Sequence, residues 1–265
     1  MLLLKKLSKA DGDNDGGAMI PTLLNAFCVD GPNGTHACLV TDVARCSVIE
    51  AKRRGSYAPL MLPVARAIAA QLILAVAYLH SKGLVHGDLH LGNVLFRLPQ
   101  DFQLWSDEEL SSRCGEPELE PVQTFDNKPI PPGVPSIATL PIWFPMERIN
   151  KLPLADAHIV LADFGELYRP SQEPQFECCT PVHSRPPEHR FEPEKPKSFP
   201  SDIWTLAMET MGSAEKGALF AMLRSMLAYK PEQRCSIEQV LRSEWVTRFA
   251  MPEYKGMRTR DTMRT

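Results

Sequence analysis

Residues 86–93 combine side-chain types that phosphoryl transfer from a nucleotide requires. The segment reads His-Gly-Asp-Leu-His-Leu-Gly-Asn, and a second acid follows in Asp163-Phe164-Gly165. Asp88 is a candidate base for an incoming hydroxyl group, whereas Asn93 and Asp163 are candidate oxygen ligands for Mg²⁺. A single Asp in a loop is more often a turn residue, but the pattern H-x-D-x-x-x-x-N followed by an apolar strand and D-F-G is specific. The sequence therefore predicts a kinase-type site.

Short strands and one long helix should hold these residues in place. Residues 94–96 follow the motif as a short apolar strand, and residues 159–162 form a second one that runs into Asp163. A helix is predicted to begin at Pro63 and to end at Gly83. Its buried face is indicated by apolar residues at three-to-four spacing, which are Val64, Ile68, Leu72, Val76 and Leu79.

Strands come first along the chain and helices follow. Residues 23–29 and 36–43 predict a hairpin around a turn at 30–34. Residues 97–157 are polar, rich in proline and aperiodic, with helical character at 106–112, as expected of an insertion. Three later helices are predicted, one that begins with Ser201 or Asp202 as its cap and two at residues 219–227 and 236–245. This order indicates an α+β fold with the chemistry at the junction.

Composition narrows the class of protein further. The chain has 265 residues and a net charge of −3 at pH 7, so its charge does not favour a nucleic-acid partner. The longest apolar run, residues 64–79, contains Arg66 and Gln71 and is too short for a membrane span, so no membrane partner is expected. Seven cysteines without paired spacing favour a reducing compartment, and we expect a cytoplasmic or nuclear location, or both.

Two superfamilies share the motif at residues 86–93. Gly87 and His90 resemble the small-molecule phosphotransferases of the aminoglycoside and choline kinase type. Later elements resemble the eukaryotic protein kinase family instead, and these are Pro187-Glu188, Asp202-Ile203-Trp204-Thr205 and Arg234, a candidate partner for Glu188. Three elements in family order favour the protein kinases.

Among protein kinases, the chain resembles the SR-protein-kinase-like serine/threonine kinases, particularly fungal ones. The resemblance rests on residues 30–40, on Trp105-Ser106-Asp107, on residues 115–118 and on an insertion placed between the catalytic loop, residues 86–93, and Asp163. It implies ATP and Mg²⁺ as cofactors and a protein substrate rich in Arg and Ser. It also implies a protein-kinase-like fold with a truncated small β lobe and a mainly helical large lobe.

The resemblance assigns roles to individual residues. Asp88 is the base, and His90, which stands where the family has Lys near the transferred phosphoryl group, is a second catalytic candidate. Asn93 and Asp163 hold the metal and the nucleotide phosphates. The hinge from Asp42 to Ala44 and the apolar floor at Leu95 bind adenine, while His86 is structural and hydrogen-bonds towards residues 163–165. Because Gly87 replaces an Arg that normally receives a phosphate, a switch by activation-loop phosphorylation is not expected.

The chain departs from the family pattern at its start. It has no G-x-G-x-x-G, its first glutamate is Glu50, and Lys5, Lys6 and Lys9 lie too close to the first strand to be the strand lysine. Residues 1–10 resemble the end of the helix that carries the partner glutamate, and the region after Trp204 is short. We therefore expect residues 1–55 to be a remnant of the small lobe and hinge, 56–250 to be the large lobe with its insertion at 97–157, and 251–265 to be a disordered tail.

These departures leave three functions open. The first is an ATP-dependent serine/threonine protein kinase whose activity is impaired by the missing glycine-rich loop and lysine. The second is a catalytically inactive pseudokinase that acts as a scaffold. The third is a small-molecule phosphotransferase.

Overall fold

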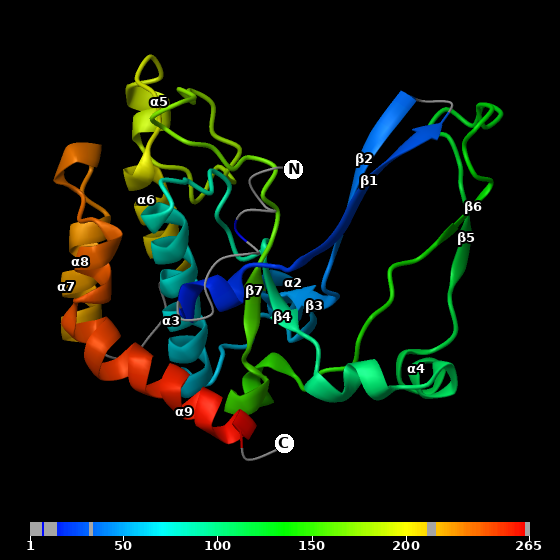
Figure 1. The fold of residues 1–265 in the computed structure, drawn as a ribbon, viewed down its shortest axis with the longest axis horizontal. Coiled ribbons are helices and arrows are strands. Elements are labelled where there is room, and N and C mark those ends of the chain that lie inside the picture. The colour runs from blue at the N-terminus through cyan, green and yellow to red at the C-terminus, as the bar shows by residue number, and fades with distance from the viewer. Residues whose placement is uncertain (1–6, 8–14, 32–33, 211–215, 263–265) are drawn as a thin grey trace.

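The computed structural model describes residues 7, 15–31, 34–210 and 216–262. In these residues a mainly helical body stands beside an arm made of a β ribbon and the long insertion (Figure 1). The predicted helical segment at residues 2–7 lies outside the described residues except for Leu7, which is buried.

Helix α3, Leu62–Ser81, is the centre of the core. Pro63 lies in its first turn, and Gly83, with a φ of 71°, donates to the carbonyl of His80 just past its end. The predicted helix is therefore confirmed, together with both of its end signals. By length and composition α3 could cross a membrane, but 67% of its most apolar window is buried inside the protein, as in the core helix of a globular domain.

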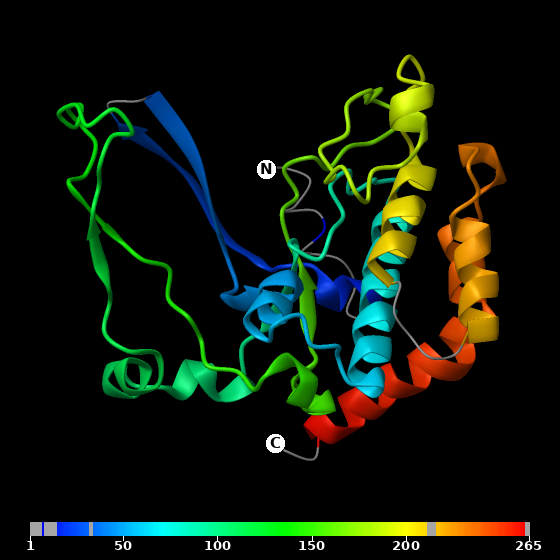
Figure 2. The same ribbon diagram turned by 180° about the vertical axis from the view of Figure 1, so that it is seen from behind.

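Further helices pack along α3 (Figures 1 and 2). They are α6 (Phe199–Thr210), α8 (Ile237–Leu241), a π-helical turn at Val246–Ala250 and α9 (Met251–Thr262), whereas α7 (Lys216–Met226) packs against α6. The prediction of a disordered tail at 251–265 is wrong for residues 251–262. Tyr254 and Met257 are buried in the core, and Arg66 of α3 pairs with Glu253 at 3.1 Å. Burial of Tyr254 and Met257 outweighs the basic character of the segment.

Helix α6 begins at Phe199, two residues before Ser201 and three before Asp202, the two predicted caps. Ser201 and Asp202 are therefore not its caps. The hydroxyl group of Ser201 donates to the carbonyl of Ser198 at 2.6 Å, and Asp202 is buried and faces the catalytic loop. Contacts with that loop override the local capping preference of Asp202, whereas the Ser201 hydroxyl bonds to the residue just before α6.

A three-stranded sheet positions the metal-ligand candidates. Strands β3 (Ala44–Ser47), β4 (Val94–Arg97) and β7 (Ile159–Leu161) form an antiparallel sheet in the order β3-β4-β7. Val94 pairs with Leu161, and the amide of Ala162 donates to the carbonyl of Asn93 at 2.7 Å. The end of β7 therefore lies beside the start of β4, which brings the segments that carry Asn93 and Asp163 together.

The predicted hairpin is present as strands β1 (Leu23–Gly31) and β2 (Gly34–Thr41). It forms a separate two-stranded ribbon that extends away from the body (Figure 2). Several of its apolar side chains are exposed, among them Phe27 and Leu39. The ribbon therefore shares no strand with the sheet that positions Asn93 and Asp163.

The insertion at residues 97–157 is mostly irregular, as predicted. The expected helix is present as α4 (Asp107–Cys114), capped by the Ser106 hydroxyl, which accepts a hydrogen bond from the amide of Glu109. The sequence reading missed a short hairpin of β5 (Leu119–Pro121) and β6 (Ile137–Thr139), whose side chains are exposed. Shorter elements complete the chain, and they are η1 (Asp15–Met19), α2 (Val48–Arg54), η2 (Gln100–Leu104), η3 (Ile149–Lys151), η4 (Leu154–Asp156), α5 (Glu188–Phe191) and η5 (Pro231–Gln233).

Candidate active site

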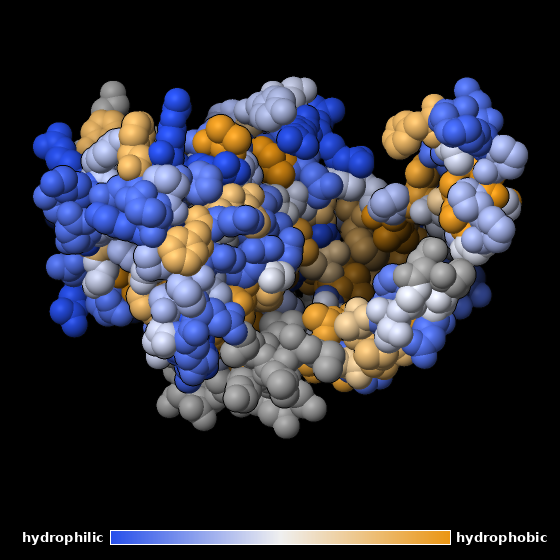
Figure 3. Space-filling model, turned by 90° about the horizontal axis from the view of Figure 1, so that it is seen from above, coloured by the Kyte–Doolittle hydropathy of each residue, from blue (hydrophilic) through white to orange (hydrophobic). Residues whose placement is uncertain are grey.

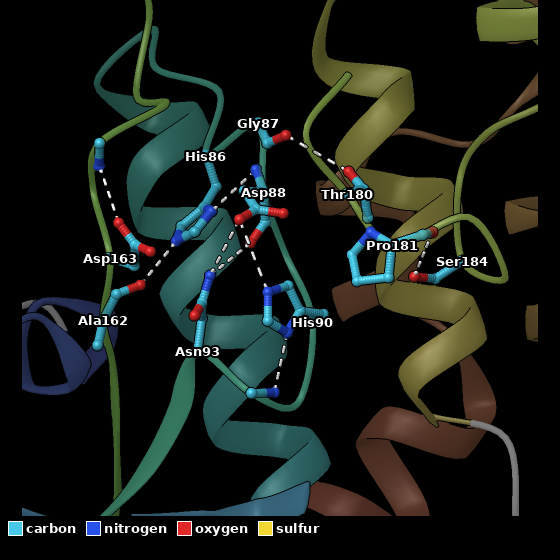
Figure 4. A network of polar contacts seen from close by, with 12 residues as sticks. His86, Gly87, Asp88, His90, Asn93, Ala162, Asp163, Thr180, Pro181 and Ser184 are labelled. Atoms are coloured by element: carbon cyan, nitrogen blue, oxygen red, sulfur yellow. Dashed lines mark hydrogen bonds and ion pairs between the residues drawn. The ribbon is translucent and has the colours of Figure 1, made fainter. Parts of the chain in front are cut away.

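His86 is the buried centre of the catalytic loop (Figure 4). Its Nε2 lies 3.1 Å from the carbonyl oxygen of Ala162, and its Nδ1 accepts a hydrogen bond of 3.3 Å from the amide of Asp88. With Nδ1 as acceptor, Nε2 carries the hydrogen and donates to Ala162. Burial lowers the pKa of His86, so the ring is neutral. His86 therefore joins the loop to the strand that leads to Asp163, and its side-chain hydrogen bond reaches Ala162, one residue before the predicted segment 163–165.

Asp202 of α6 fixes the backbone of the catalytic loop through hydrogen bonds. Its Oδ2 accepts from the amide of His86 at 2.8 Å, and its Oδ1 accepts from the amide of Gly87 at 3.2 Å. His80, at the end of α3, lies 3.0 Å from Oδ2. Burial acts to raise the pKa of Asp202, but the hydrogen bonds that it forms with the His80 side chain and the His86 amide outweigh burial and leave that pKa lowered. A buried carboxylate with three interactions of this kind is a rigid support.

Asp88 has two unlike carboxylate oxygens. Oδ2 lies 3.4 Å from Nδ2 of Asn93 and 3.6 Å from Nε2 of His90. Nδ2 of Asn93 also donates to the backbone carbonyl of Asp88 at 3.0 Å. Oδ1 is buried and has no hydrogen-bond partner among the described residues. A buried oxygen without a partner is costly in a purely structural role. Asp88 therefore has one carboxylate oxygen held by its neighbours and one without a partner among the described residues.

Asp163 stands at the mouth of the site in a strained conformation. Its φ is 59°, a left-handed value that is uncommon for a residue other than glycine. Its Oδ1 accepts from the amide of Gly165 at 3.3 Å, which supports the turn. The side chain is exposed, whereas Phe164 packs its ring 5.4 Å from the ring of His86. Strain of this type at an exposed carboxylate is typical of a ligand-binding position.

The residues present fit a magnesium–nucleotide complex. Because Nδ2 of Asn93 donates to Asp88, the amide oxygen of Asn93 is left as a ligand, and Asp163 supplies a carboxylate. No group of three or more His, Cys, Asp or Glu side chains able to hold a metal occurs in the part of the chain that the structure describes. Mg²⁺ commonly uses one or two protein oxygens and takes its remaining ligands from phosphates and water, so two oxygens suffice.

The predicted adenine-binding residues are less closely gathered. Leu95 lies on β4, where it pairs with Ser47 and Val160, and is half-buried. Ala44 pairs with Arg97 on the neighbouring strand. Asp42 is exposed, and its Oδ2 accepts from the amide of Thr22.

Asp42 also lines a cavity of about 850 Å³. This cavity lies between the base of the ribbon and the start of the insertion, and Leu95, Asn93 and Asp163 do not line it. The molecule is hollowed between the body and the arm (Figure 3). Asp42 is therefore not brought together with the metal-ligand candidates, whereas Asp88, His90, Asn93 and Asp163 do gather around His86 (Figure 4).

The segment after Asp163 packs against the catalytic loop through its backbone. Val85 and Tyr168 exchange two backbone hydrogen bonds of 3.0 and 3.2 Å. Gly87 has a φ of 82°, and a Cβ atom there would lie 2.7 Å from the carbonyl oxygen of Glu166. Any side chain at this position would therefore require the backbone to shift.

Thr180 continues this packing, and sequence reasoning missed it. Its buried hydroxyl lies 3.4 Å from the carbonyl oxygen of Gly87, to which it donates. A threonine in a proline-rich loop carries no local signal for such a contact, and neither does His80 at the end of an apolar helix. Both contacts join residues far apart in the sequence.

The predicted pair between Glu188 and Arg234 is confirmed. Nη1 and Nη2 of Arg234 donate to the two carboxylate oxygens of Glu188 at 2.7 and 2.5 Å, and both side chains are buried. Arg234 also donates to the carbonyl of Pro200, and its guanidinium carbon lies 4.9 Å from the ring centre of Trp204. The pair therefore ties α5 to α6, the helix that carries Asp202.

Comparison with known proteins agrees with this architecture. No protein-family model matches the chain. Serine/threonine-protein kinase spk-1 of Caenorhabditis briggsae is 33% identical over 100 residues, which is 37% of this chain and 9% of the relative. Serine/threonine-protein kinase SRPK of Physarum polycephalum is 30% identical over 111 residues, which is 41% of this chain and 26% of the relative.

A solved structure matches the fold over most of the chain. The crystal structure of the PF14_0431 kinase domain has a TM-score of 0.61 and 16% identity, and the match covers 92% of this chain and 81% of that one. The chain therefore has a protein-kinase-like fold, and its sequence relatives are SR-protein-kinase-like serine/threonine kinases. The matched segment spans between about a tenth and a quarter of the length of those two relatives.

Proposed function

We propose that this chain is an ATP-dependent serine/threonine protein kinase. The observation that carries the proposal is the arrangement of Asp88, whose Oδ1 is buried without a partner, beside Asn93 and the strained Asp163. A base and two oxygen ligands in this order are the parts that phosphoryl transfer requires. The kinase relatives support the same reaction class.

Each residue has a defined role in the proposed reaction. The substrate hydroxyl oxygen forms a bond to the γ-phosphorus while its proton passes to Oδ1 of Asp88. The bond between the γ-phosphorus and the oxygen that bridges to the β-phosphate breaks, and ADP leaves. Asp163 and the amide oxygen of Asn93 would hold Mg²⁺, which neutralises the charge on the phosphates when it is bound. Leu95 contributes an apolar surface for adenine, and the backbone from Asp42 to Ala44 contributes polar contacts.

The proposed substrate is a protein rich in Arg and Ser, in line with the SR-protein-kinase-like relatives. We propose a cytoplasmic or nuclear location, or both. All seven cysteines are free, which fits a reducing compartment. The proposal includes no nucleic acid and no membrane as a direct partner.

Two measurements test the proposal on the full chain. A thermal shift with millimolar ATP and Mg²⁺ should stabilise the protein, and Asp163→Asn should weaken that stabilisation because a metal ligand is lost. Transfer of radioactive phosphate to an Arg-Ser peptide should fall by at least about a hundredfold in Asp88→Asn, the range expected when a general base is removed. Transfer that survives Asp88→Asn would contradict the assigned base. Transfer to an amino alcohol or an aminoglycoside, but not to the peptide, would point to a small-molecule phosphotransferase.

One observation favours a second function, that of a non-enzymatic binding protein. Asp163 is exposed. In the described part of the chain, no ion pair between a lysine and a glutamate lies beside Asp163. Protein kinases use such a pair to hold the nucleotide phosphates. An absence of stabilisation at millimolar ATP, with a folded protein, would favour this pseudokinase.

A further inference from the structure

His90 holds its imidazole ring against the backbone of the catalytic loop, directly beside Asp88 (Figure 4). The amide of Gly92 donates to Nδ1 at 3.0 Å, and the opposite nitrogen, Nε2, lies 3.6 Å from Oδ2 of Asp88. Because Nδ1 accepts a hydrogen bond, the hydrogen of the neutral ring is on Nε2 and is directed at the carboxylate. At 3.6 Å this is an electrostatic contact rather than a short hydrogen bond.

Gly92 makes room for this ring. A Cβ atom on Gly92 would lie 2.6 Å from Cε1 and 2.7 Å from Nδ1 of His90. Gly92 does not have a positive φ, so its backbone conformation does not call for glycine. The ring of His90 is what requires a residue without a side chain at this position.

The loop that carries the ring is itself fixed. The amide of Leu91 donates to Oε2 of Glu209 on α6 at 3.3 Å, and the amide of Asn93 donates to the carbonyl of His90 at 2.9 Å. The carbonyl of Leu91 accepts from the amide of Ile49 at 3.4 Å. The ring therefore rests on a backbone with little freedom, as a precise positioning contact requires.

The ring acts on only one side of the Asp88 carboxylate. Oδ2 faces Nε2 of His90 and Nδ2 of Asn93, whereas Oδ1 has no partner among the described residues. Both ring nitrogens of His90 are already engaged, so the ring cannot reach towards a transferred phosphoryl group without leaving Gly92. This differs from a lysine at the same position, whose flexible ammonium group is a mobile charge.

We propose that His90, seated on Gly92, is a positioning residue that turns the Asp88 carboxylate so that Oδ1 faces the substrate hydroxyl. The inference rests on the proposed kinase function and deepens it, because it changes the role of His90 from a group near the phosphoryl group to one that orients the base.

A pair of glycine variants tests the geometry independently of activity. Gly92→Ala pushes the ring aside but keeps the imidazole, and Gly256→Ala is the matched control, because a Cβ atom there meets nothing within 4 Å. In protein labelled with ¹⁵N-histidine, the ring shifts should place the hydrogen of His90 on Nε2 in the unmodified chain and in Gly256→Ala. Asp88→Asn should move the Nε2 resonance in both of these backgrounds but not together with Gly92→Ala. A hydrogen on Nδ1, or an Nε2 resonance that ignores Asp88→Asn, would overturn the inference.

Kinetics with ATP and an Arg-Ser peptide test the role in the reaction. Gly92→Ala should lower kcat by roughly ten- to a hundredfold and change KM for ATP by less than about twofold, because the base is misplaced while nucleotide binding is kept. His90→Gln, which keeps an N–H donor directed at Asp88, should retain more activity than His90→Ala. Equal kcat values for Gly92→Ala and Gly256→Ala would overturn the positioning role. An unmodified chain without any transfer, but with the predicted resonances, would overturn the proposed function and leave the ring geometry standing.

Discussion

Glu188→Gln is expected to destabilise the protein far more than the loss of a surface ion pair. The substitution removes the negative charge but keeps the shape, so Arg234 is left buried with an uncompensated charge. Breaking a buried pair from one side costs about 3–5 kcal/mol. Nε, Nη1 and Nη2 of Arg234 still donate to the carbonyls of Ala228, Pro200 and Tyr229 at 2.8, 3.0 and 3.0 Å. We therefore expect the lower end of the range, about 3 kcal/mol.

Urea denaturation followed by circular dichroism measures this cost. For a chain of this size, a loss of about 3 kcal/mol should lower Tm by about 6–12 °C in a thermal scan. The same chain supplies a control, because Arg248 and Glu244 form an exposed i,i+4 pair whose side chains are 69% and 57% accessible. Glu244→Gln should change stability by less than about 0.5 kcal/mol.

The comparison between the two variants decides the reasoning. Glu188→Gln could lower the free energy of unfolding by less than about 1 kcal/mol, as the loss of an exposed pair does. In that case Arg234 finds water or another acceptor, and the pair does not hold α5 and α6 together. If the cost is large but transfer activity at low temperature is unchanged, the Glu188–Arg234 pair serves stability alone and does not affect the position of Asp202.

Three further predictions concern other parts of the fold. Gly87→Arg should destabilise the chain by about 1–3 kcal/mol, because the new Cβ meets the carbonyl of Glu166 and φ is left-handed; a variant as stable as the unmodified chain in urea would contradict the backbone contact. Burial lowers the pKa of His86, so the unfolded state binds a proton more readily than the folded state does. Stability should therefore fall as the pH drops below about 6.5, by up to about 1.4 kcal/mol per pH unit. Urea midpoints at pH 7.5 and 5.5 should show this slope, and His86→Gln should reduce it. Met257→Ala should cost about 2–5 kcal/mol and raise hydrogen exchange along α9, whereas a free tail would show neither effect.

The residues that carry chemistry could be predicted because their spacing is local. The eight residues from His86 to Asn93 lie in one loop, and Asp163 comes directly after a short apolar strand in the sequence. Pairing of β4 with β7 then follows from two apolar segments that each flank one of these residues. The contact between Glu188 and Arg234 was predictable only through the family resemblance, since no local pattern links residues 46 positions apart.

The supports of the site could not be predicted, because each depends on a contact between distant segments. Asp202 at a helix start has the local signature of a cap, and its true partners, the amides of His86 and Gly87, come from a loop more than 110 residues earlier. Tyr254 and Met257 are two apolar residues within a basic segment, too few to show a period, yet both are buried.

Gly92 shows most clearly where reading a sequence ends. A glycine in a loop usually signals a turn that needs a positive φ, and Gly87 fits that rule. Gly92 does not, and its reason becomes visible only when the ring of His90 is seen where a Cβ atom would be. The two glycines of the motif are therefore needed for different reasons. Gly87 allows a positive φ and a close approach to the carbonyl of Glu166, and Gly92 leaves space for the ring of His90 beside Asp88. A substitution at either position perturbs the same base by a different route: Gly87→Arg acts through the fold of the loop, and Gly92→Ala acts through a single ring.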